Sequence, residues 1–399
     1  MYISEKGKRV SPSTTLAIDS KFKAMKAEGI DVVGFCTGEP DFDSPTHVKN
    51  AAKDALDRGI TKYTPASGTV DLKKAVCRKL KRDNGLDYNP TDIVISNGAK
   101  HSLSNIFTAI LNPGDEVVIP SPFWVSYPEM VSMADGKSVF INTTAETEFK
   151  ISAADFEKVI TPKTRAIIIN SPSNPTGSVY SKEELKAIAD VAVKHNIYII
   201  SDEVYEHLIY DGAKHVSIAS LGEEIKKLTI VVNAMSKTYA MTGWRIGYTA
   251  CEKELATVMA NIQSHGTSNP NSFAQAASCV ALDGSLDCVE EMKVEFKKRR
   301  NYMFEKINSI KGVSCIMPNG AFYIMMNIDE IIGHTMYGKT IKGSDDFAEL
   351  FLEKALVAIV PCSGFGADNY LRWSYATSME TIVTGLDRLE KFIEEGLDK

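Results

Sequence analysis

The chain has 399 residues, of which 44% are hydrophobic and 24% charged, and its formal net charge is −6 at pH 7. At about 100–200 residues per domain, this length predicts one large and one smaller domain with sizeable cores. The acidic balance, without any basic block, argues against nucleic acid and anionic membranes as partners. No apolar run reaches the ~18 residues of a membrane span, and the N-terminus lacks the apolar core of a signal peptide, so we expect a cytoplasmic protein.

Several common kinds of site have no signature in the sequence. The seven cysteines are scattered and form no C-x-x-C pair, which fits a reducing compartment better than a disulfide framework. No group of His, Cys and carboxylates has the spacing of metal ligands, so no metal is expected. Neither a G-x-S-x-G elbow nor a phosphate-binding P-loop is present.

The predicted elements begin with a helix at about residues 15–28 and a loop that ends at Pro45. The middle of the chain then alternates helices with short β-branched runs, as expected for strands buried on both faces of a parallel sheet. These runs are residues 93–95, 116–119, 165–169, 197–200 and 229–232. Between them, one helix follows Gly98 and ends near Leu111, and a capping box from Ser181 to Glu184 opens a helix to about His195. This alternation predicts an α/β domain.

The last third of the chain has a different pattern. A long charged helix is expected at residues 288–310, then strands at 320–326, 358–361 and 370–375, and finally a closing helix. We therefore predict a large domain of residues 43–285 and a small α+β domain formed by residues 1–42 and 286–399.

Candidate site residues follow the predicted strands at their carboxyl ends. They are Gly98, Ala99 and Lys100 after the first run, Asn174 after the third, Asp202 after the fourth, and Ser236 and Lys237 after the fifth. In open α/β sheets, ligands bind in the crevice outside these strand ends. Together with Tyr205, Arg245 and Arg372, these residue types suit an anionic ligand that contains nitrogen.

Seven segments carry a family resemblance. The stretch Ser236-Lys-Thr-Tyr-Ala-Met-Thr-Gly-Trp-Arg-Ile-Gly247 resembles the cofactor-lysine motif of class I aminotransferases, which are pyridoxal-phosphate enzymes of fold type I. The others, in family order along nearly the whole chain, are Gly38-Glu-Pro-Asp-Phe-Asp43, Tyr63-Thr-Pro, Pro122-Phe-Trp-Val-Ser-Tyr127, Ser171-Pro-Ser-Asn-Pro-Thr-Gly177, Ser201-Asp-Glu-Val-Tyr205 and Arg372-Trp-Ser-Tyr-Ala-Thr377. The resemblance implies a large domain whose mainly parallel sheet is sandwiched by helices, beside a smaller α+β domain.

The resemblance implies that Lys237 holds pyridoxal 5′-phosphate as a Schiff base and later acts as a base, which requires an amine that can be neutral near pH 7. Asp202 would keep the pyridine nitrogen protonated; outside this motif, its ordinary role would be a helix N-cap. Tyr205 and Asn174 would hydrogen-bond the cofactor's phenolic oxygen; otherwise Tyr205 is a core aromatic and Asn174 a turn residue. The catalytic residues are therefore expected to be Lys237, Asp202 and Tyr205.

The remaining roles concern the phosphate, the ring and the subunit contact. Gly98, Ala99 and Lys100 would offer the amides of a helix N-terminus to the phosphate, assisted by Ser236 and Arg245. The resemblance stacks Trp124 on the pyridine ring. It also makes Tyr63 reach the phosphate of a neighbouring subunit, which implies a homodimer with shared sites.

On the substrate side, the resemblance pairs Arg372 with the α-carboxylate, together with Gly38, Asn174 and Trp124. The closest likeness is to bacterial aspartate aminotransferases with Lys at the position of Lys100, where the lysine is tied to acidic substrates. A cation in the first turn of a helix is mildly unfavourable, and a distal substrate carboxylate would offset that. The alternative is an exposed helix lysine.

These roles predict reversible, ping-pong transfer of the amino group from L-aspartate to 2-oxoglutarate, with the small domain closing over the substrate. Aromatic or other amino acids, including prephenate, are alternative substrates, although branch members that use prephenate tend to have a basic residue where this chain has Ser11. A pyridoxal-phosphate-dependent β-lyase is an alternative on the same fold. A non-catalytic regulatory module is disfavoured, because no DNA-binding domain or basic patch precedes residue 30.

Overall fold

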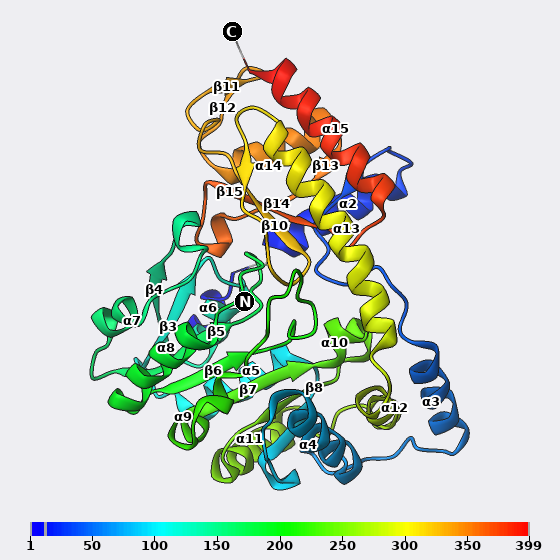
Figure 1. The fold of residues 1–399 in the computed structure, drawn as a ribbon, viewed down its shortest axis with the longest axis vertical. Coiled ribbons are helices and arrows are strands. Elements are labelled where there is room, and N and C mark those ends of the chain that lie inside the picture. Colours follow the sequence, from blue (N-terminus) through cyan, green and yellow to red (C-terminus); the bar gives the residue numbers. More distant parts are fainter. Residues whose placement is uncertain (1, 12–13, 398–399) are drawn as a thin grey trace.

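The computed structural model describes residues 2–11 and 14–397. Its largest sheet has seven strands in the order β2-β8-β7-β6-β5-β3-β4 (Figure 1). Their bounds are β2 Ile93–Ser96, β3 Glu116–Ser121, β4 Lys137–Asn142, β5 Thr164–Asn170, β6 Tyr198–Asp202, β7 Thr229–Ala234 and β8 Gly247–Ala250. All strands run in one direction except β8, which is antiparallel to both its neighbours. The prediction of an α/β fold with a mainly parallel sheet is confirmed.

Helices bury both faces of this sheet. Successive side chains of a strand point to opposite faces. In β5, Ala166 and Ile168 pack with helices α5 (Ala99–Ile110), α6 (Ser126–Met133) and α11 (Lys253–Gly266). Ile167 and Ile169 pack on the other face with α7 (Ala153–Val159), α8 (Lys182–His195) and α9 (Glu223–Leu228). Each isoleucine side chain contributes about 1.5–3 kcal/mol when fully buried, which explains the continuous apolar runs.

A second, four-stranded sheet has the order β14-β15-β10-β9. Its strands are β9 Ser314–Cys315, β10 Tyr323–Asn327, β14 Val360–Pro361 and β15 Tyr370–Ser374. Helices α13 (Asp287–Ser309), α14 (Ser344–Ala355) and α15 (Met379–Gly396) lie around it, above the large sheet in Figure 1. The short strand β1 (Val33–Gly34) pairs with β13 (Val357–Ala358), and this pairing brings the N-terminal segment beside the C-terminal one. The domain limits at residues 43 and 285 stay a prediction.

Three further helices belong to the framework: α2 (Thr14–Ala27), α3 (Thr46–Asp57) and α4 (Val70–Asn84), with α12 (Ser272–Asp283) packed on α3 and α4. Helix α4 ends at Gly85, whose φ of 68° is left-handed, a conformation that glycine adopts without strain. The capping box of α8 is present as predicted, since Ser181 accepts from the Glu184 amide and Glu184 accepts from the Ser181 amide.

The structure differs from the sequence expectations in several strands. Strands β4 and β8 were not expected. The run 358–361, expected as one strand, is divided between β13 and β14, which belong to different sheets.

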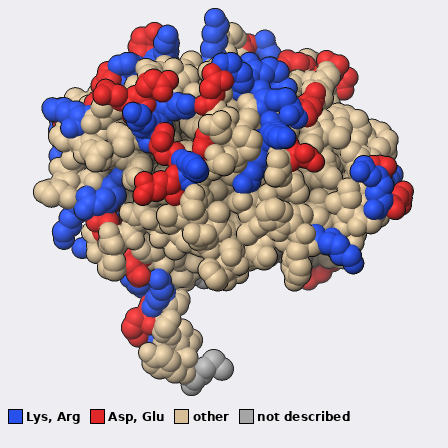
Figure 2. All heavy atoms as spheres, turned by 90° about the horizontal axis from the view of Figure 1, so that it is seen from below, with Lys and Arg blue, Asp and Glu red and all other residues tan. Residues whose placement is uncertain are grey.

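The N-terminal segment stands out from the body at the bottom of Figure 2, where it ends in an undescribed residue. It contains helix α1 (Glu5–Lys8), and Lys6 and Arg9 both pair with Asp135. Acidic and basic side chains are interspersed on the face seen in Figure 2. Among the described residues, no helix is long and apolar enough to cross a membrane.

Candidate active site

A cleft of about 450 Å³ lies at the carboxyl ends of β5, β6 and β7 and reaches the second sheet. It brings together all the predicted site residues except Gly98 and Tyr63. Those that line it are Gly38, Ala99, Lys100, Trp124, Asn174, Asp202, Tyr205, Ser236, Lys237, Arg245 and Arg372. Five cationic and three acidic side chains line the cleft, so its charge favours an anionic ligand.

Asp202 is the last residue of β6 and is 4% exposed. The hydroxyl of Tyr127, on α6, donates to its Oδ2 atom over 2.7 Å. Burial raises the pKa of Asp202 to about 6, and the hydrogen bond from Tyr127 acts in the opposite direction. A buried carboxylate with so little compensation is well placed to hold a cationic group in the cleft.

Lys237 lies directly after β7, in the short helix α10 (Met235–Thr238). Its half-buried ammonium donates to the carbonyl oxygen of Gly38. Burial lowers the pKa of Lys237 to about 8, and Arg372 and Arg245 act in the same direction, whereas Glu39 and Asp202 oppose them. A substantial fraction of this amine is therefore neutral near physiological pH, as a nucleophile or base requires.

The N-terminus of α5 forms one end of the cleft. The first amides of a helix have no partners within it, and Ala99 and Lys100 of this first turn line the cleft together with Ser236 and Arg245, a typical arrangement for an anion site. Gly98, the N-cap, has φ 82°, and a Cβ atom there would lie only 2.6 Å from Nη2 of Arg245. Gly98 thus lies beneath the arginine and does not line the cleft. Arg245 donates to the carbonyl oxygens of Thr242 and Asn97 over 2.9 and 3.2 Å.

Arg372, on β15, forms the opposite end and is 2% exposed. Its Nη1 atom donates to Oδ1 of Asn174 over 3.1 Å, and its Nη2 atom donates to the carbonyl oxygen of Cys36 over 2.9 Å. The buried Nε atom has no hydrogen-bond partner within residues 2–11 and 14–397. Since guanidinium carries five N–H donors, the group retains donors for an incoming carboxylate.

Lys100 lies in the first turn of α5, and its Nζ atom is 4.9 Å from the centroid of the Trp124 ring. Lys100 is exposed as a residue, but partial burial of its ammonium and then Arg245 lower the pKa of Lys100. Because an unpaired ammonium is unfavourable beside another cation, an anionic group of a ligand would stabilise Lys100 in this place.

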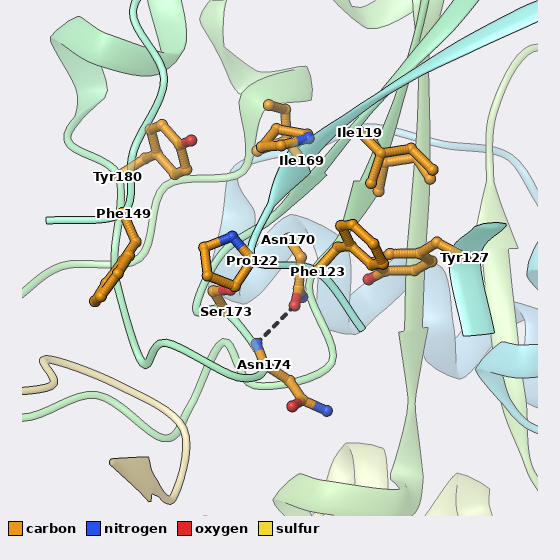
Figure 3. Close-up of a pocket in the computed structure, with 12 residues that line it drawn as sticks. Ile119, Pro122, Phe123, Tyr127, Phe149, Ile169, Asn170, Ser173, Asn174 and Tyr180 are labelled. Carbon is orange, nitrogen blue, oxygen red and sulfur yellow. Dashed lines mark hydrogen bonds between the residues drawn. The ribbon is translucent and has the colours of Figure 1, made fainter. Parts of the chain in front are cut away.

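Asn170 links Asn174 to Asp202, and Figure 3 draws its hydrogen bond with Asn174. Its Oδ1 atom accepts from the Asn174 amide over 2.8 Å, and its Nδ2 atom donates to the Asp202 carbonyl over 3.0 Å. A small cavity of about 20 Å³, sufficient for one water molecule, shares Tyr127, Asn170 and Asn174 with the cleft.

Tyr63 is separate from this group. Its side chain is 90% exposed, and it does not line the cleft of its own chain. The prediction that it reaches a neighbouring subunit remains a prediction.

Sequence reasoning did not single out several residues of the cleft. Tyr127 and Glu39 were seen only inside longer motifs, whereas Asn170, Tyr323, Asp19 and Lys23 were not considered. Asn170 directly follows the predicted run 165–169 and ends β5, so its position carried a usable signal. Asp19 and Lys23 come from α2 and pair with each other over 2.7 Å, and nothing in their local sequence indicates that α2 borders the site.

The matching family model is "Aminotransferase class I and II", which covers residues 30–389. The chain belongs to this aminotransferase family. It is 47% identical over 392 residues to an aspartate aminotransferase of Bacillus sp. (strain YM-2), which covers 98% of this chain and 99% of that one. It is 45% identical to an aspartate/prephenate aminotransferase of Nitrosomonas europaea, over 98% of this chain and 100% of that one. Among solved structures, an aspartate aminotransferase from Rhizobium meliloti superimposes with a TM-score of 0.96 at 42% identity, covering 99% of this chain and 100% of that one.

A second cluster of buried ionisable groups in this aminotransferase lies just after Asp202 in the chain. Glu203, Glu206 and His215 place possible ligand atoms within 4.8 Å of one another. The carboxylates already have donors: Ser201 and Ser217 donate to Glu203, while Lys79 and Asn233 donate to Glu206. The two carboxylates are therefore occupied by protein donors, although the buried Nδ1 atom of His215 has no partner among the described residues, and we assign the cluster a structural role.

Proposed function

We propose that this aminotransferase binds pyridoxal 5′-phosphate in the cleft and transfers the amino group of L-aspartate to 2-oxoglutarate. The observation that carries the proposal is the convergence of three groups in one cavity: the readily deprotonated Lys237, the buried Asp202 and the forked donor Arg372. The family membership of the chain supports the same reaction class.

The residues present fit the cofactor. The cleft has the size of ordinary small-molecule sites, which range over about 300–1,000 Å³. Its anion site at the start of α5, with Ser236 and Arg245, suits a phosphate. Asp202 suits a protonated ring nitrogen, Trp124 offers an aromatic face, and Tyr205 and Asn174 offer hydrogen-bonding groups to a ring oxygen.

Pyridoxal phosphate, when bound, supplies an electron sink that weakens the bond from the substrate's Cα to its proton. Nζ of Lys237 would attach the cofactor. Once the amino group of the substrate has displaced Nζ from that bond, the freed amine would accept the Cα proton, which its lowered pKa permits near neutral pH. Asp202 holds a positive ring nitrogen in place. Arg372 and Asn174 orient the α-carboxylate so that the Cα proton faces the lysine. Product release after each half-reaction makes the kinetics ping-pong.

Lys100 is the proposed determinant of substrate class. Lys100 lies in the first turn of α5, against Trp124, whereas Arg372 enters the cleft from β15 of the second sheet. A dicarboxylic substrate would engage Arg372 with its α-carboxylate and Lys100 with its distal one. A neutral sulfur amino acid, the substrate of a β-lyase, has no group for Lys100.

The test compares aspartate, alanine and phenylalanine as amino donors, with wild type and Lys100→Ala. Loss of kcat/KM confined to aspartate supports the assignment, and an equal loss with all three donors overturns it. Cystathionine serves as the β-lyase control: release of ammonia with a keto acid, without transfer to 2-oxoglutarate, would favour the lyase.

We propose a homodimer with shared sites and a cytoplasmic location. Tyr63 is 90% exposed and Tyr2, in the N-terminal segment, is 91% exposed, so both offer aromatic contact surface to a second copy. The described cysteines are all free, which fits a reducing compartment.

A further inference from the structure

Tyr323 lies in the cleft beside Arg372 and Tyr205. It is fully buried, begins β10 and lines the cavity. In the antiparallel pairing of β10 and β15, Tyr323 is opposite Ser374, so Arg372 is its diagonal neighbour on the same face of the sheet. The guanidinium carbon of Arg372 lies 4.5 Å from the centroid of the Tyr323 ring. The ring therefore supports the arginine that is to receive the substrate carboxylate.

The hydroxyl of Tyr323 has a second neighbour in the site. It lies 3.1 Å from the hydroxyl of Tyr205. It also borders Gly38, where a Cβ atom would lie 3.0 Å from the Tyr323 oxygen. One side chain thus contacts the arginine of the second sheet, the tyrosine that follows β6 and the loop whose carbonyl accepts from Lys237.

We propose that Tyr323 is a positioning residue with two separable functions: its hydroxyl orients the proton of Tyr205 toward the bound cofactor, and its ring fixes the plane of Arg372 for the substrate carboxylate. The inference rests on the proposed function. Tyr323 lies outside the sequence motifs of Arg372 and Tyr205 and contacts both side chains only in the folded chain.

The number of protons on the two phenols decides which of them donates in the hydrogen bond between Tyr205 and Tyr323. A phenol hydroxyl has one proton. If Tyr205 donates its proton to an oxygen of the cofactor, it cannot also donate to Tyr323, so Tyr323 donates to Tyr205. Accepting this hydrogen bond makes Tyr205 a stronger donor, because hydrogen bonds in a chain polarise one another. Burial raises the pKa values of both phenols, so both keep their protons at physiological pH.

The second function needs only the ring. A guanidinium over an aromatic face is stabilised electrostatically, more so when both are desolvated. With the ring below it, Arg372 keeps the orientation in which Nη1 reaches Asn174 and Nη2 reaches Cys36. Removal of the Tyr323 ring would allow the Arg372 guanidinium to leave this orientation, whereas removal of the hydroxyl alone would not.

The experiment uses three holoenzyme variants: Tyr323→Phe, Tyr323→Leu and the control Tyr375→Phe. Tyr375 is also a fully buried phenol, but its hydroxyl donates to the Ala321 carbonyl and does not line the cleft. Two quantities are measured: the pKa of the cofactor's absorbance change, and the dissociation constant of succinate, a dicarboxylate that cannot be transaminated.

We expect Tyr323→Phe to raise the absorbance pKa by about 10–30% of the rise caused by Tyr205→Phe, with succinate binding unchanged. In the Tyr205→Phe background, Tyr323→Phe should add no further shift. Tyr323→Leu should also weaken succinate binding by about three- to tenfold. Tyr375→Phe should change neither quantity.

The inference is overturned if Tyr323→Phe behaves like Tyr375→Phe, or if Tyr323→Leu binds succinate as well as Tyr323→Phe does. Wild-type protein that shows no cofactor absorbance or no transamination would instead overturn the proposed function itself. The two failures are therefore distinguishable.

Discussion

Arg372 and Asn174, which are 198 residues apart in the chain, share a buried hydrogen bond of 3.1 Å from Nη1 to Oδ1. This bond joins β15 of the second sheet to the loop after β5 of the first. The proposed carboxylate site thus exists only where the two sheets meet, and its geometry depends on both.

Arg372→Lys tests that geometry. Lysine keeps the charge but loses the planar fork, and hydrogen bonds to charged groups contribute about 1.5–3 kcal/mol each. We expect kcat/KM for both aspartate and 2-oxoglutarate to fall by about 10–100-fold. Arg388→Lys is the control, since Arg388 also tethers segments by donating to the Asp31 and Leu356 carbonyls but lies outside the cleft. Unchanged KM values in Arg372→Lys would contradict the assignment.

The lowered pKa of Lys237 predicts how cofactor attachment depends on pH. The group has a pKa of about 8 in the cofactor-free protein, and only the neutral amine attacks a carbonyl. The rate of covalent attachment, trapped with borohydride and located by peptide mapping, should rise about tenfold per pH unit below 8 and then level off. A rate that continues to rise up to pH 10 would show that Lys237 has the pKa of an ordinary lysine.

Removal of the Lys79 charge should strongly lower the free energy of unfolding, because Lys79 and Glu206 form a buried ion pair. Both side chains are almost fully buried. Lys79→Met leaves Glu206 without its cation, so we expect a loss of about 3–5 kcal/mol in the free energy of unfolding. Lys81→Met, on the same helix, breaks only the exposed pair with Asp87 and should cost less than about 1 kcal/mol. Equal losses in the two variants would contradict the network.

The same pair makes a prediction about acid stability. Burial alone would raise the pKa of Glu206, but Lys79, then His207 and His215, lower it to about 2. The stabilisation is complete above the unfolded pKa of about 4.3, and is lost as the pH falls toward 2. Urea unfolding of wild type should therefore show stability decreasing across this window, with a smaller slope in a Glu206→Gln variant.

Tyr63 makes the shared-site prediction testable by complementation. Lys237→Ala and Tyr63→Ala subunits, separately tagged and co-expressed, should form heterodimers with one fully wild-type site. The purified heterodimer should recover about half of the wild-type activity, well above either parent homodimer. A heterodimer no more active than the mean of the two parents would show that each chain supplies its own tyrosine.

The sequence was most informative where local rules apply. The Ser181–Glu184 capping box and the apolar runs of β5 and β7 depend on neighbouring residues, and both are found as predicted. The predicted residues that meet in the cleft follow from the general position of ligands at strand ends.

The elements that were missed depend on distant partners. Strand β8 has four residues and exists because β2 and β7 pair with it on either side. Tyr323 resembles any core aromatic of a strand, and its contact with Tyr205 links residues 118 positions apart. Helix α2 borders the cleft through tertiary packing that its own sequence does not specify.

The most direct test of the account is the absorbance and turnover of Lys237→Ala, with Lys182→Ala on the exposed side of α8 as control. We expect the control to bind pyridoxal phosphate covalently and to transaminate aspartate like wild type. Lys237→Ala should fold, form no covalent link with the cofactor and lose at least about 10²–10⁴-fold in kcat. Wild-type turnover in Lys237→Ala, or a borohydride-stable link at another lysine, would contradict the central claim.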